Sequence, residues 1–192
     1  MKIIGLTGGI GSGKSTVLEF FKEFDIPVYI SDIEAKKIMH SSKDVIFKVT
    51  ELFGDKAYVK GFLNSKFIAE IVFSDKQKLK ALNAIVHPAV YKDFLEFVKL
   101  QVSNYVIYES ALLFENNSES HFDKTILVVA PLKLRIKRLQ KRDESTIPEI
   151  EARINNQLPD EDKIKKADFV VKNTDLYFTK CEIQRLHNLF LL

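Results

Sequence analysis

The sequence of 192 residues has a single cysteine, no tryptophan and a formal net charge of only +3. The lone Cys181 excludes an intramolecular disulfide framework and a multi-cysteine metal site, and it suits a reducing compartment. No apolar run approaches the ~18 residues of a membrane-spanning helix. The glycines near the N-terminus come too early for the apolar core of a signal peptide. We therefore predict a cytoplasmic globular protein.

The charge balance also limits the class of partner. Lysine and arginine number 29 against 26 aspartates and glutamates, which is too mild an excess to favour nucleic acid or an anionic membrane as the main partner. The composition is 46% hydrophobic and includes 15 phenylalanines, enough for one substantial core. We expect neither a nucleic-acid nor a membrane partner, and the oligomeric state is not indicated.

Apolar runs alternate with helical stretches, a pattern typical of a parallel α/β sheet. The expected strands are residues 2–7, 27–30, 105–108, 125–130 and 169–171. Helices are expected at 15–24, at 131–142 and at 175–192. A further polar helix is expected after a turn at 143–148, and it ends at residue 157. The stretch between the second and third strands is far too long for one crossover helix. Its helical pattern over residues 42–102 predicts a helical lobe inserted into the sheet domain.

Within this lobe the sequence predicts separate helices. Residues 65–73 and 75–86 each begin with a residue that can cap a helix. His87-Pro88 is expected to open a third helix, because proline fits the first helical turn.

Residues 8–16 (GGIGSGKST) match the phosphate-loop pattern G-x-x-x-x-G-K-[ST] at every fixed position, between an expected strand and an expected helix. Glycines let successive backbone N–H groups face phosphates, and the helix adds the positive end of its dipole. Lys14 should reach the β- and γ-phosphates, and the Ser15 hydroxyl should bind Mg²⁺. The alternative is a glycine-rich turn with an exposed lysine. The predicted ATP-binding residues are Gly9, Gly11, Ser12, Gly13, Lys14, Ser15 and Thr16.

A phosphate loop alone does not distinguish a kinase from a GTPase or a motor. The chain has no N-K-x-D motif for reading guanine and no L-S-G-G-Q element of transporter ATPases. A small kinase needs a carboxylate near the acceptor hydroxyl and mobile cations over the phosphates.

Three residues outside the loop are candidates for parts of such a site, each with a structural alternative. Asp32 follows the second strand, where ligands of parallel sheets bind, but a helix N-cap explains it equally well. Glu109 ends the third strand and could help to hold Mg²⁺ through water, or it is an ordinary surface carboxylate. His87 could touch a ligand, or it is a histidine at a helix start.

The helix expected at 131–142 carries the candidate cations. At about 100° per residue, Arg135, Arg138 and Arg142 fall within about 60° of one another, beside the packed face. The lysines at 133, 137 and 141 point toward solvent. Arg138 and Arg142 could cover the phosphates, and the alternative is a solvated basic helix.

In their order along the chain, these residues resemble the dephospho-CoA kinase family. The likeness begins with residues 5–16 (GLTGGIGSGKST) and continues through 27–32 (PVYISD) and Ala35-Lys36. It includes residues 138–143 (RLQKRD), which look like the lid signature of that family. Further matches are 52–54, 61–63, 72–73, 87–88, 112–115, 153–154, Gln157, Lys163, 167–168 and Asn173.

The resemblance implies a P-loop NTPase fold: a three-layer α/β/α arrangement with a five-stranded parallel sheet, an inserted helical substrate lobe and a helical lid. The implied segments are a core of 1–31, 103–136 and 158–192, a lobe of 32–102 and a lid of 137–157. The implied reaction transfers the γ-phosphate of ATP to the ribose 3′-hydroxyl of dephospho-CoA, the last step of coenzyme A synthesis, with Mg²⁺.

By the same resemblance, the catalytic residues are Asp32 as general base, Lys14, Arg138 and Arg142. Asp32, His87 and Lys36 are implied to contact the substrate. Ile30, Ala111 and Arg135 depart from the aspartate, proline and glutamine that are usual in the family, and Lys36 and Lys66 replace common arginines. Two alternatives remain at this point: a kinase for another small acceptor, and a regulatory protein that binds ATP without transferring phosphate.

Overall fold

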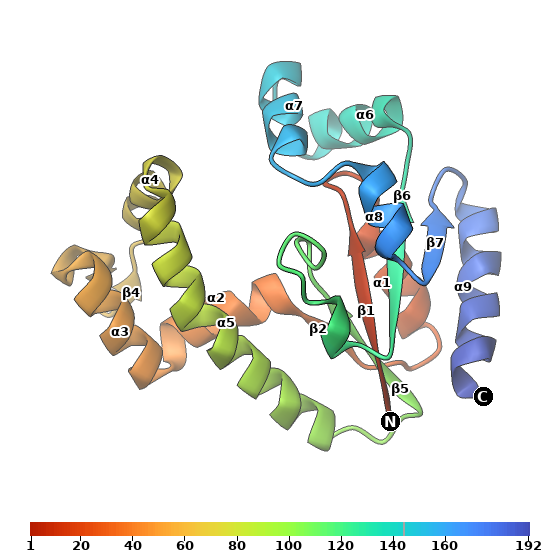
Figure 1. Cartoon of the computed structure of the whole chain (residues 1–192), viewed down its shortest axis with the longest axis horizontal. Helices are drawn as coiled ribbons and strands as arrows, with labels where there is room; N and C mark the ends of the chain where they lie inside the picture. Colours follow the sequence, from red (N-terminus) through yellow and green to blue (C-terminus); the bar gives the residue numbers. More distant parts are fainter. Residues whose placement is uncertain (144) are drawn as a thin grey trace. The chain divides into compact units, whose positions relative to one another are not determined.

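The computed structural model describes residues 1–143 and 145–192, and it divides into two compact units (Figure 1). Residues Met1–Ile30 and Gln101–Leu192 form the sheet unit, and Ser31–Leu100 form the helical unit. None of the helices in the described part of the chain combines the length and the apolar character needed to span a membrane.

The sheet unit contains five parallel strands in the order β2-β5-β1-β6-β7. They are β1 (Lys2–Gly8), β2 (Val28–Ile30), β5 (Tyr105–Glu109), β6 (Lys124–Val129) and β7 (Phe169–Lys172). The accompanying helices are α1 (Lys14–Lys22), η2 (Glu119–His121), α6 (Leu132–Asp143), α7 (Ile147–Asn155), α8 (Asp160–Lys166) and α9 (Leu176–Leu191). The predicted five-stranded parallel α/β fold is therefore confirmed, and the predicted strands and helices of this unit end within two residues of those expected, whereas η2 and α8 were not predicted.

The core of this unit lies on both faces of the sheet. Ile126 and Val128 of β6 pack with apolar side chains of α1 and α9, which lie next to each other. Leu127, between them in sequence, packs with Leu113 and Phe114 in a second cluster. Burial on both faces explains why the strands read as continuous apolar runs rather than as alternating ones.

Helix α9 also places His187 in a partly buried contact. The Tyr105 hydroxyl lies 2.8 Å from His187 Nδ1, and the imidazole stacks on the Phe24 ring with centroids 4.4 Å apart. Burial lowers the pKa of His187 below its ordinary value of 6.5. At pH values just below 6.5, His187 therefore binds more protons in the unfolded chain than in the folded one.

We therefore expect the free energy of unfolding to decrease as the pH falls below about 6.5. His187→Gln should make this decrease shallower, although it also loses the ring stacking and lowers stability at every pH. Urea unfolding at several pH values between 7.5 and 5 measures the slope. The same slope in both proteins would contradict the prediction.

The helical unit is built around one long helix. It contains α2 (Ser31–Ser41), α3 (Lys43–Phe53), η1 (Asp55–Ala57), β3 (Tyr58–Val59), β4 (Phe62–Leu63), α4 (Ser65–Ser74) and α5 (Lys76–Lys99). Helices α2, α3 and α4 all pack against α5. The antiparallel β3–β4 hairpin was not predicted, because each strand is only two residues long. Lys60 and Gly61, with φ of 52° and 83°, form its turn, in which both residues have positive φ.

The prediction that a new helix begins at His87-Pro88 is wrong, because α5 continues through Pro88 without interruption. A proline inside a helix removes one backbone hydrogen bond and crowds the preceding turn. The packing explains why the helix continues: Val86, Val90 and Phe94 are all buried, and they lie at intervals of four residues across the proline. Tertiary burial of this face outweighs the local cost.

Candidate active site

The phosphate loop connects β1 to α1 at the carboxyl end of the sheet. Gly11 and Gly13 have φ of 78° and 96°, in the region where side chains other than glycine are strained. A Cβ on Gly13 would also collide with the amide of Asn173. Helix α1 begins at Lys14, so its N-terminal N–H groups and the positive end of its dipole adjoin the loop. The predicted ATP-binding residues, Gly9 and residues 11–16, therefore lie together on the loop and the first turn of α1.

Two side chains hold the carbonyl oxygens of this loop. Arg138 donates through Nη1 to the carbonyls of Ser12 at 3.0 Å and Gly11 at 3.4 Å. Asn173 Nδ2 donates to the same Ser12 carbonyl at 2.9 Å, and Thr179 Oγ1 donates to Asn173 Oδ1 at 3.3 Å. The N–H and C=O of a trans peptide point in opposite directions. Holding the Ser12 carbonyl therefore directs the Gly13 N–H away from Arg138 and Asn173.

Asn173→Asp tests this support. The substitution keeps the shape but replaces the donor NH₂ with a carboxylate oxygen 2.9 Å from the Ser12 carbonyl, in a buried position. We expect a loss of about 3 kcal/mol in the free energy of unfolding, measured by urea denaturation, because a buried donor becomes a repelling anion. The control is Asp175→Asn, which makes the reverse exchange of a carboxylate for an amide at the exposed N-cap of α9. It should lower the free energy of unfolding by about 1 kcal/mol or less. An Asn173→Asp protein as stable as the unmodified one would contradict the conclusion that Asn173 holds the loop.

Lys14 and Glu109 are neighbours at the carboxyl ends of β1 and β5. Lys14 Nζ donates to the Gly8 carbonyl at 3.0 Å and lies 3.6 Å from Glu109 Oε1. The Glu109 residue is only 5% exposed, so the alternative that it is an ordinary surface carboxylate is wrong. A buried carboxylate beside the loop lysine fits a site that handles cations and phosphates.

The two predicted lid arginines differ in their surroundings. Arg138 lies against the loop, whereas Arg142 is exposed and pairs with Asp143 through two hydrogen bonds of 2.6 and 2.9 Å. Hydrogen bonds from Arg142 and Arg153 lower the pKa of Asp143 to about 2. The predicted exposure of the lysines on α6 is confirmed. The predicted lid, 137–157, includes Glu144, which lies outside the described residues.

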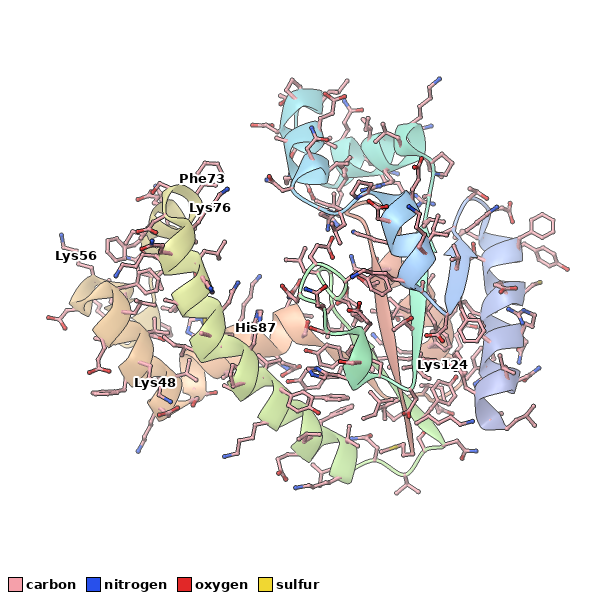
Figure 2. All side chains as sticks on the ribbon, in the orientation of Figure 1. Lys48, Lys56, Phe73, Lys76, His87 and Lys124 are labelled. Carbon is pink, nitrogen blue, oxygen red and sulfur yellow. The ribbon has the colours of Figure 1, made fainter. Side chains whose placement is uncertain are left out.

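In the helical unit, Asp32 and Lys36 lie one turn apart on α2, and both are exposed. Asp32 is the second residue of the helix, so the alternative that it is the N-cap is wrong. Figure 2 shows His87 partway along α5, so the helix-start alternative for this residue is wrong as well. Burial lowers the pKa of His87, and the negative charge of Asp32 partly opposes this effect. The structure thus brings Asp32 and His87 within electrostatic reach of each other.

Sequence reasoning gave no role to several residues that contact the loop. Asn173 and Gln157 were noted only as matches to the family. Arg135 was noted as a departure from it and as one of three arginines beside the packed face of its helix, but it was given no function. Arg135 is the most buried arginine on α6 and contacts the Ile10 carbonyl. The available signal was its place on the same side of the helix as Arg138.

The family model and the curated relatives indicate one family. Residues 2–177 match the family model described as dephospho-CoA kinase. A curated dephospho-CoA kinase of Salinibacter ruber is 39% identical over 178 residues, which cover 90% of this chain and 89% of the relative. A crystal structure from Thermus thermophilus superposes with a TM-score of 0.90 at 35% identity, covering 100% of this chain and 98% of the other. The structure of the dephospho-CoA kinase of Campylobacter jejuni superposes with a TM-score of 0.71 at 29% identity, covering 97% of this chain and 95% of the other.

Proposed function

The chain belongs to the dephospho-CoA kinase family, and we infer that it transfers the γ-phosphate of ATP to the ribose 3′-hydroxyl of dephospho-CoA, the last step of coenzyme A synthesis. The observation that carries this function is the phosphate loop, with its carbonyls held by Arg138 and Asn173 and its lysine beside a buried carboxylate. The sequence segments 32–102 and 137–157 are proposed as substrate lobe and lid. A cytoplasmic location and the absence of a nucleic-acid partner stay predictions.

For the nucleotide, we assign binding to the N–H groups of the loop and to Lys14. The loose transition state of phosphoryl transfer spreads negative charge over the γ-phosphate oxygens, so fixed donors and cations supply most of the catalysis. Lys14 exchanges its contact with the Gly8 carbonyl for phosphate oxygens. Arg142, which is exposed and held only by its neighbour Asp143 among the contacts described, is the arginine we assign to covering the phosphates.

For the acceptor, we assign Asp32 as the group that orients the 3′-hydroxyl and accepts its proton. Its carboxylate is exposed in the first turn of α2. Lys36, one turn further along α2, and His87 are assigned to substrate contacts. The low pKa of His87 keeps its ring neutral near pH 7, so it can donate or accept a hydrogen bond without adding charge.

The residues beside the loop also fit Mg²⁺. Magnesium prefers oxygen ligands and commonly keeps several waters while it is held by one or two protein groups and by phosphates. The exposed Ser15 hydroxyl on α1 and the Glu109 carboxylate are donors of this kind, and we propose Ser15 as a direct ligand and Glu109 as a ligand through water. When bound, the ion would neutralise charge on the β- and γ-phosphates.

The test is incubation of the purified protein with ATP, Mg²⁺ and dephospho-CoA. We expect ADP and a product with the mass of coenzyme A, both dependent on the acceptor. ADP without that product would overturn the acceptor assignment and call for a panel of other alcohols and nucleosides. ATP binding with neither product would overturn the enzymatic function in favour of a regulatory nucleotide-binding protein.

A further inference from the structure

Arg135 is buried behind the phosphate loop and bonds in two directions. The residue is 5% exposed, although an arginine usually keeps its guanidinium in water. Its Nε donates to the Ile10 carbonyl at 2.8 Å, and its Nη1 donates to Asp160 Oδ2 at 3.1 Å. The guanidinium also lies so close to Gly9 that a Cβ there would collide with it. Arg135 thus connects α6, the loop and the start of α8.

The N–H of Ile10 is held as well. It donates to Gln157 Oε1 at 2.8 Å, so both backbone polar groups of Ile10 are occupied by side chains more than a hundred residues away in sequence. Gln157 and Asp160 belong to the same short segment, residues 157–160, which leads from α7 into the first residue of α8 and which we term the connector.

The connector is itself anchored to the segment that follows β5. Glu115 Oε1 accepts from the Leu158 N–H at 3.1 Å and lies 2.7 Å from the fully buried Nζ of Lys163. A buried ion pair of this kind is costly to break, because either partner alone would be an uncompensated charge. The connector therefore offers a fixed support on which the loop can be held.

We propose that Arg135 is a positioning residue for phosphate binding. By holding the Ile10 carbonyl, it fixes the peptide between Ile10 and Gly11, so the Gly11 N–H points away from Arg135, to the opposite side of the loop backbone. Its ion pair with Asp160 fastens that peptide to the connector. Gln157 occupies the Ile10 N–H and thereby removes this group from phosphate binding. The proposal rests on the proposed nucleotide binding at this loop, and it adds a residue for which the family resemblance implies no role.

Two variants separate the loop bond from the ion pair. The Nε2 atom of glutamine and the Nε atom of arginine are the same number of bonds from Cα. Arg135→Gln can therefore keep the donor to the Ile10 carbonyl while it loses the contact to Asp160. Arg135→Met has a similar length and no donor. We expect Arg135→Met to weaken binding of Mg-ADP and of inorganic tripolyphosphate, by calorimetry, by about tenfold or more, the scale of a lost charge-assisted hydrogen bond. Arg135→Gln should stay within about threefold of the unmodified protein.

Kinetics and stability separate positioning from mere structural support. Arg135→Met should raise KM for ATP, while KM for dephospho-CoA at saturating ATP stays unchanged. If both variants lose melting temperature equally, yet only Arg135→Met loses phosphate affinity, positioning is supported. Unchanged phosphate affinity in Arg135→Met, or equal loss in both variants, would overturn the proposal. If the unmodified protein bound no nucleotide, the proposed function would fail instead, so the two failures are distinguishable.

Discussion

Replacing Asp32 with asparagine should lower kcat by about 10²–10⁴ while the affinity for ATP stays within a few fold. The range is that of a positioned general base, and an amide cannot accept the proton that leaves the acceptor hydroxyl. The fold should tolerate the change. Asp32 is exposed in the first turn of α2, so losing its charge there costs only about 0.5 kcal/mol of dipole interaction.

Glu34 offers a matched control for this variant. It is the other acidic residue in the first turn of α2, and it pairs with Lys37 at 2.8 Å. Glu34→Gln removes the same charge from the same helix end without touching the proposed base. We expect Glu34→Gln to keep nearly full activity when both variants are measured at saturating ATP and dephospho-CoA. Equal losses in the two variants would assign the effect to the helix dipole rather than to proton transfer.

His87 provides a second readout for the same substitution. The charge of Asp32 raises the pKa of His87 against the larger lowering by burial. Removing that charge should therefore lower the pKa of His87 further, and an NMR titration of the imidazole protons measures the shift. A shift without loss of turnover would show that the two side chains interact but that Asp32 is not the base.

The parts of this protein that could be predicted from sequence are those that local patterns specify. The phosphate loop needs glycines at fixed positions because two of them, Gly11 and Gly13, adopt positive φ. The strands are buried on both faces and therefore appear as continuous apolar runs. In each case the physical requirement acts on residues that are adjacent in the chain, so it leaves a mark that one sequence displays.

The residues that hold the loop could not be predicted in this way. Asn173 follows strand β7 and bonds to Ser12, which is 161 positions away. Nothing local distinguishes it from a polar residue in a turn. The continuity of α5 escaped prediction for a related reason, since proline signals a boundary and the burial that overrides it comes from packing against other helices.

Lys14→Ala should lower kcat/KM for ATP by about 10²–10³ or more, because it removes the one lysine of the phosphate-loop motif, the cation assigned to the β- and γ-phosphates. Lys14→Arg should recover little of this loss. It keeps the charge, but a planar fork cannot replace a compact ammonium at the start of α1. Steady-state kinetics with varied ATP, and calorimetry with Mg-ADP, measure the two effects.

Lys14→Ala should also lower the stability of the protein, and this second effect can be separated from the loss of activity. The Lys14 and Glu109 side chains are 16% and 7% exposed, so the variant leaves a buried carboxylate without the ammonium 3.6 Å away. We expect a loss of about 3 kcal/mol in the free energy of unfolding from this change alone. The double variant Lys14→Ala/Glu109→Gln removes both charges and should regain much of that stability, as urea denaturation would show.

The double variant then decides between two explanations of lost activity. If Lys14 acts on the phosphates, the double variant stays as inactive as Lys14→Ala although its fold is restored. If Lys14 serves mainly to neutralise Glu109, activity returns together with stability. Glu109→Gln alone completes the comparison. It should keep ATP affinity within about tenfold, because Lys14 is still present to contact the phosphates. It should also raise the Mg²⁺ concentration needed for half-maximal activity if Glu109 holds the ion through water.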